Sequence, residues 1–184
     1  MNTEFQESIN NLKYWISKNE AILEKKLWKD SKEIIEAEIL RFKIQSITIE
    51  ELDAIRKYTN NNLPESYYYF LSEVGTGQFF TGEYLPSFEI YNLAELQEYN
   101  NLFQQEVENT EEVVNDEFLI VGTDCAMGDW MGFCTTRMEE NNFDIFCHEY
   151  PIDEYVETSD ELKSWRTFEE WMIKVIETKG RKSL

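Results

Sequence analysis

The sequence predicts an α+β protein with a single mixed, mostly antiparallel sheet flanked by helices, and with an N-terminal helical extension. Three observations lead to this prediction. Two short amphipathic helices meet at a Leu-Pro corner within residues 48–74, an apolar run at 118–122 stands among segments of alternating polarity, and an aromatic helix follows near the C-terminus. Helical and two-residue periodicities mixed in this way are typical of helices packed on a sheet.

The length of 184 residues and the hydrophobic fraction of 42% are those of one globular domain with its own core. We expect residues 1–45 to form the N-terminal helical extension and residues 46–184 to form the main α+β domain. No apolar run approaches the ~20 residues that span a bilayer, and the first residues lack a basic and then apolar leader pattern. Together with three irregularly spaced cysteines, these features predict a cytoplasmic protein with reduced thiols.

The N-terminal extension reads as helix over residues 3–42, because neither Gly nor Pro occurs before Leu63. Its first apolar stripe consists of Phe5, Ile9, Leu12 and Ile16. A second helical segment would be capped by Asp30 or Ser31 and would turn three isoleucines inward, at positions 34, 35 and 39.

The stretch from Thr48 to Phe80 carries the clearest local signals. Thr48 and Glu51 have the spacing of a capping box, so a helix should begin there. Asn60, Asn61 and Asn62 should end that helix, and Pro64 should start the next one. The second helix has an apolar stripe formed by Tyr67, Phe70, Leu71 and Val74, and it should end at Gly75 and Gly77.

This stretch resembles the SUKH superfamily, which includes a fungal regulator of cell-wall synthesis and many bacterial immunity proteins that neutralise toxins. The residues that carry the resemblance are Leu63, Pro64, Tyr67, Phe70, Leu71, Gly75 and Gly77. The order of the later segments is also similar to this superfamily, so the resemblance spans roughly residues 46–179.

Those later segments alternate between short strands and helices. A strand at 88–90 precedes a helix that Asn92 should cap and that should run to about Val107. Residues 106–117 are strongly acidic and are expected to form a loop, and the apolar run at 118–122 should be a buried central strand.

The last third of the chain should complete the sheet and cover it. Strands are expected from 130 and over 143–148, with alternating faces in the second. The acidic run 153–161 is expected to be a loop. Thr167 and Glu170 repeat the capping-box spacing at the start of the aromatic terminal helix.

Charge is distributed very unevenly along the chain, whose formal net charge is −20. Residues 58–162 contain 23 acidic side chains and a single basic one, Arg137. Such a segment disfavours direct nucleic-acid binding, which requires Lys and Arg against phosphates, and favours steered association with a basic protein. The alternative is that the carboxylates only keep the protein soluble.

Chemical motifs are weak. Cys147 and His148 are adjacent, and on a strand adjacent side chains leave opposite faces, so they cannot act as a pair. Cys125 and Cys134 lack the spacing of zinc ligands, and Gly75–Gly77 is too short for a phosphate-binding loop. We therefore expect no catalytic residues, no metal and no cofactor.

The charge and the resemblance together suggest an immunity protein that binds a cognate, basic, nuclease-type toxin and covers its active or substrate surface. Candidate partner-binding residues are Tyr84, Asp124, Asp129, Trp130, Glu139, Glu140 and Asp144. Core packing is the alternative role for Trp130 and Tyr84. The partner would be a protein, with no nucleic acid or membrane bound, and the chain itself a monomer or weak dimer. Alternative functions are an intracellular scaffold or regulator, and a nucleic-acid mimic.

Overall fold

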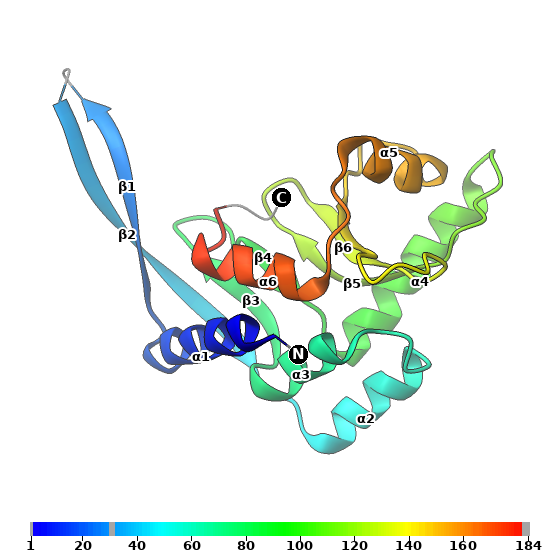
Figure 1. Ribbon diagram of the computed structural model, residues 1–184, viewed down its shortest axis with the longest axis horizontal. Helices are drawn as coiled ribbons and strands as arrows, with labels where there is room; N and C mark the ends of the chain where they lie inside the picture. The colour runs from blue at the N-terminus through cyan, green and yellow to red at the C-terminus, as the bar shows by residue number, and fades with distance from the viewer. Residues whose placement is uncertain (1, 30–31, 182–184) are drawn as a thin grey trace.

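In a computed structural model, which describes residues 2–29 and 32–181, one seven-stranded sheet forms the centre of the protein (Figure 1). Neighbouring strands follow in sequence order, and every pairing among the described residues is antiparallel. The strands are β1 (Ala21–Lys29), β2 (Lys32–Gln45), β3 (Thr76–Thr81), β4 (Phe88–Ile90), β5 (Phe118–Asp124), β6 (Asp129–Cys134) and β7 (Phe143–Phe146). The predicted α+β class is confirmed.

Helices cover both faces of the sheet. They are α1 (Thr3–Lys18), α2 (Ile49–Tyr58), α3 (Glu65–Glu73), α4 (Leu93–Asn109), the 3-10 turn η1 (Ile152–Glu154), α5 (Tyr155–Leu162) and α6 (Phe168–Glu177). On one face, Phe168 of α6 packs against Phe133 of β6 and against α3. On the other, Phe103 of α4 packs against Phe118 of β5 and Trp130 of β6. Aromatic rings thus fill both layers between helices and sheet.

The predicted Leu-Pro element is confirmed. The Glu51 amide donates to Thr48 Oγ1 over 3.2 Å and the Thr48 amide donates to Glu51 over 2.7 Å, which completes the capping box. Asn60 and Asn61 have positive φ angles of 50° and 57° where α2 ends. The chain then turns at Pro64 into α3.

Gly75 has to be a glycine because its backbone lies directly against β2. Its φ is 104°, in a region that favours glycine, and a Cβ there would lie 2.2 Å from the carbonyl oxygen of Gln45. The glycine therefore both ends α3 and lets β3 pair with β2.

The cap predicted at Asn92 and the capping box predicted at Thr167 and Glu170 are also present. Asn92 accepts hydrogen bonds at the start of α4, and Thr167 accepts one from the Glu170 amide at the start of α6. The strands expected at 88–90, from 118 and from 130 appear as β4, β5 and β6. In β7, all four residues are buried.

The prediction of helix for residues 20–42 is wrong. The chain leaves α1 at Asn19, whose φ is 47°, and continues as the long antiparallel hairpin of β1 and β2. The capping positions suggested at Asp30 and Ser31 lie outside the described residues. Isoleucines are frequent in this segment, and β-branched side chains pack better on a pleated strand than in a helix.

The expectation of a loop over residues 153–161 is also wrong, because η1 and α5 form there. Ile152, Tyr155 and Ser159 are buried, at the spacing of one helical face. The acidic side chains between them occupy the solvent side, and Lys163 ends the helix with a φ of 53°. The acidic residues of 153–161 thus lie on the exposed face of a helix and not in a loop.

Candidate protein-interaction surface

The structure separates the seven residues proposed for partner binding into several places. Asp124 and Asp129 face each other across the β5–β6 turn, and Asp144 lies in β7. Trp130 lies in β6, Tyr84 lies between β3 and β4, and Glu139 and Glu140 lie between β6 and β7. They do not form one continuous patch.

The exposure assumed for the three aspartates is wrong. Asp124, Asp129 and Asp144 are only 6%, 7% and 1% exposed. Buried carboxylates need hydrogen-bond partners, and each of these has them. The backbone amide of Ala126 donates to Asp124, and Ser164 Oγ donates to Asp144. These aspartates hold turns and connections in place in the free protein.

Asp129 pairs with the single histidine. Its Oδ1 accepts a 3.0 Å hydrogen bond from the His148 amide and lies 2.7 Å from His148 Nδ1. This pair ties the chain after β7 to the start of β6. In the described part of the chain, no hydroxyl or thiol is hydrogen-bonded to the imidazole, so the pair lacks the nucleophile that a catalytic triad would require.

The remaining proposed residues divide by exposure. Trp130 is half-buried against Tyr99 and Phe103, as in the core-packing alternative. Tyr84 is 84% exposed. Glu139 and Glu140 are exposed on the β6–β7 connection.

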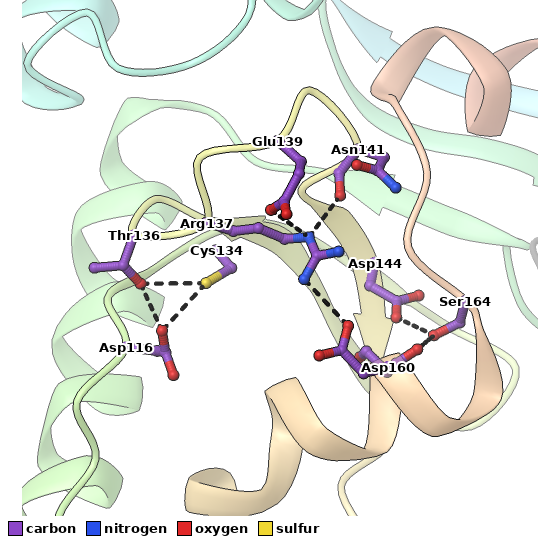
Figure 2. A network of polar contacts seen from close by, with 10 residues as sticks. Asp116, Cys134, Thr136, Arg137, Glu139, Asn141, Asp144, Asp160 and Ser164 are labelled. Carbon is purple, nitrogen blue, oxygen red and sulfur yellow. Dashed lines mark hydrogen bonds and ion pairs between the residues drawn. The ribbon is translucent and has the colours of Figure 1, made fainter.

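Arg137 organises the connection that carries Glu139 (Figure 2). Its Nη1 lies 3.1 Å from Asp160 of α5, and its Nε donates to the Asn141 carbonyl over 3.1 Å and lies 3.4 Å from Glu139. The guanidinium also covers the ring of Trp165 at 4.8 Å. This role of Arg137 was not predicted from the sequence, although Arg137 is the single basic residue among the 23 acidic ones of residues 58–162.

An acidic groove lies beside this network, between the segment that precedes β5 and the η1–α5 segment. Its volume is ≈560 Å³. The residues that line it are Glu112, Val113, Val114, Asn115, Asp116, Phe118, Ile152, Asp153, Glu154, Val156 and Glu157. Five of these are carboxylates and none is basic, while the valines and Phe118 supply apolar contact area. We call this the acidic groove.

Both walls of the acidic groove are fixed by hydrogen bonds and ring contacts. Thr136 Oγ1 donates to Asp116 over 2.8 Å, and the Thr135 amide donates to the Glu117 carbonyl over 2.7 Å. On the other wall, Tyr155 stacks on Phe146 with the ring centroids 5.1 Å apart. The groove is therefore a formed feature of the free protein.

Burial and the local negative charge shift the pKa values of neighbouring groups. The pKa of Tyr155 rises to about 12, mainly through burial and then through Glu106 and Asp129. The pKa of Cys125 also rises to about 12, through burial and then Glu89 and Asp124. Cys125 therefore remains a protonated thiol at neutral pH, unlike the thiolate of a reactive cysteine.

Within residues 2–29 and 32–181, no three His, Cys, Asp or Glu side chains are grouped so that they could hold a metal ion. Among the helices described there, none has the length and apolar character needed to cross a bilayer.

A family model and a known relative each match most of the chain. The sequence model of the SMI1/KNR4 family (SUKH-1) matches residues 46–174. Immunity protein RhsIB of Dickeya dadantii (strain 3937) is 26% identical over 140 residues, which are 76% of this chain and 80% of that protein. No solved structure matches the chain.

Proposed function

Because the chain belongs to the SMI1/KNR4 family (SUKH-1), and a relative is named an immunity protein, we propose that it protects a bacterial cell by binding a cognate protein toxin. The similarity to RhsIB covers four fifths of that protein, so it includes most of the family domain. Residues 46–184 would form this domain, and residues 1–45 would be an accessory segment. The site of action would be the cytoplasm.

The acidic groove is the observation that carries the proposal for a basic toxin. Its five carboxylates can pair with Lys and Arg side chains, which a nuclease uses to hold phosphates. Its exposed Val113 and the partly buried Phe118 add apolar contacts of the kind that anchor protein interfaces. The toxin would lose access to its substrate because the groove covers the basic surface.

Other residues would support this contact in different ways. The exposed Glu139, Glu140 and Tyr84 are available to a partner directly. Asp124, Asp129 and Asp144 would act indirectly, by holding the turns in which they are buried. The same negative surface repels phosphates, so direct binding of nucleic acid is disfavoured. No bond is made or broken in this mechanism.

The first test is rescue of cells from any toxin domain that is encoded beside this gene. Co-expression of this protein should restore growth, and the purified proteins should form a complex. Equal killing with this protein abundant would overturn the assignment for that pair. Recovery of several unrelated partners from the native cell would favour a scaffold instead.

A matched pair of variants tests the acidic groove. Glu154→Gln with Glu157→Gln removes two groove charges, and Glu7→Gln with Glu177→Gln removes two exposed charges from α1 and α6, outside the groove. We expect the groove variant to slow association about tenfold at low salt and to reduce its salt dependence, because long-range steering is screened by ions. Equal association rates for the two variants would refute the role of the groove.

A further inference from the structure

The β1–β2 hairpin presents an apolar face that the family domain does not need for its core. Ile22, Glu24 and Lys26 of β1 lie opposite Ile39, Ala37 and Ile35 of β2. Since side chains alternate along a strand, these six residues share one face, which we call the outer face. Its three isoleucines are 50%, 48% and 60% exposed at positions 22, 39 and 35.

The opposite face holds the hairpin to the rest of the protein. Ala21, Leu23 and Leu40 are buried there, at the base of the hairpin. Arg181, which follows α6, donates a 2.9 Å hydrogen bond to the Glu24 carbonyl. An ion pair between Lys25 and Glu38 links the two strands of the hairpin to each other. The hairpin is thus anchored by one face while the outer face points away from this anchor.

Charge separates the hairpin from the surface proposed for the toxin. Residues 21–45 contain six basic and five acidic side chains, whereas residues 58–162 contain one and 23. A basic toxin has no electrostatic reason to prefer the hairpin. Two copies of this acidic chain, by contrast, can approach each other with least repulsion at a near-neutral segment.

We propose that the outer face binds the outer face of a second copy of this chain, forming a twofold dimer. The face is self-complementary in charge, because it carries Glu24 and Lys26 two positions apart on one strand, and a twofold axis can bring Glu24 of one copy beside Lys26 of the other. It is also self-complementary in shape, because the small Ala37 lies between Ile35 and Ile39 and leaves room for an isoleucine of the second copy.

This dimer leaves the acidic groove accessible. The hairpin projects from the body at the upper left of Figure 1, whereas α5 and the segment that follows α4, which line the groove, lie to the right. Each copy in the dimer could therefore bind its own toxin. The inference goes beyond the proposed function and does not depend on it.

Sedimentation equilibrium of the full chain, without any toxin, tests the dimer. The wild type should form a reversible dimer with a dissociation constant below roughly 200 µM. This constant should fall as the salt concentration rises, because salt screens the repulsion between the two copies. Ile35→Glu with Ile39→Glu should raise this constant at least about tenfold, because the variant puts charge into the apolar contact. Ile49→Glu is the control, since it adds a charge at an exposed isoleucine of α2.

Charge exchange gives a second readout that a folding defect cannot imitate. Glu24→Lys and Lys26→Glu should each weaken the dimer, and the two together should restore it, because complementarity returns. A wild type that remains monomeric at roughly 200 µM would overturn the proposal. The proposal would also be overturned if Ile35→Glu with Ile39→Glu left the dissociation constant unchanged, or if Ile49→Glu raised it equally. A double charge exchange that did not restore the dimer would overturn it as well. If the chain is monomeric and Ile35→Glu with Ile39→Glu abolishes toxin binding, the outer face binds the toxin and not a second copy.

Discussion

Replacement of Arg137 by methionine should loosen the whole edge of the protein that carries the acidic groove. Arg137 connects the β6–β7 connection to α5 through Asp160 and to its own loop through the Asn141 carbonyl. Methionine keeps the apolar stem of the side chain and removes its charge and donors. The change therefore isolates the polar contacts of the guanidinium.

The structure gives the expected size of the effect. The ion pairs with Asp160 and Glu139 involve acids that are more than half exposed, so they contribute about 0.2–1 kcal/mol each. The hydrogen bond to the Asn141 carbonyl adds about 1 kcal/mol, and the contact with the Trp165 ring adds about 0.5–1 kcal/mol. The free energy of unfolding should thus fall by about 2–4 kcal/mol.

Urea unfolding followed by tryptophan fluorescence measures this loss. Lys13→Met is the control, because Lys13 makes one exposed ion pair with Glu73 and should cost less than about 1 kcal/mol. Arg137→Lys should lie between wild type and Arg137→Met, since lysine keeps the charge and lacks the planar donor group. A loss below about 0.5 kcal/mol for Arg137→Met would refute the reasoning.

Two further predictions concern stability. Gly75→Ala should lower the free energy of unfolding by at least about 3 kcal/mol, because its Cβ would overlap the Gln45 carbonyl. Gly128→Ala is the control: its φ is 82° but its Cβ would lie in open space, so it should cost only about 1 kcal/mol. Similar losses for the two variants in urea unfolding would contradict the close approach at Gly75. The raised pKa of Tyr155 stabilises the folded state fully below pH 10, the ordinary value, and this contribution is lost as the pH rises to about 12. Between pH 10 and about 12, the free energy of unfolding of Tyr155→Phe should therefore fall by roughly 2 kcal/mol less than that of the wild type, as measured by urea unfolding at alkaline pH. Identical pH profiles for the two proteins would show that Tyr155 is not the responsible group.

Local features of the fold could be predicted from the sequence because their causes are local. The capping box of Thr48 and Glu51 needs only two side chains three positions apart, and the left-handed turn at Asn60 and Asn61 needs only tolerance of a positive φ. The apolar stripe of α3 likewise follows from spacing alone. Each of these signals appears in the structure where the sequence places it.

The hairpin was missed because no Gly or Pro interrupts it. Asn19 carried a usable signal, since Asn often ends a helix in the left-handed conformation, as it does here. β2 also depends on a partner far along the chain, because Lys43, Ile44 and Gln45 pair with β3. Helical spacing of the isoleucines in one short window could not reveal that pairing.

The candidate site was harder to predict than the fold. Exposure of a carboxylate depends on which turn it caps, so acidity alone did not distinguish the buried Asp144 from the exposed Glu140. The acidic groove needs two segments about 40 positions apart in the chain, and their contact was not visible in a list of charges. Prediction of α5 from its buried positions would have placed Glu154 and Glu157 on a helical surface.

The fold leaves much of its negative charge uncompensated, and this has a consequence for binding. Arg137 pairs with only two acids of residues 58–162, and Asp144 obtains its cation, Arg166, from outside that segment. The pKa of Glu89 is raised, mainly by burial and then by repulsion from the nearby Glu95. A basic partner in the acidic groove would relieve repulsion already present in the free protein, because its cations reduce the potential at every nearby carboxylate. That relief adds to the direct contacts, so affinity should depend on the whole segment as well as on the residues that touch the toxin.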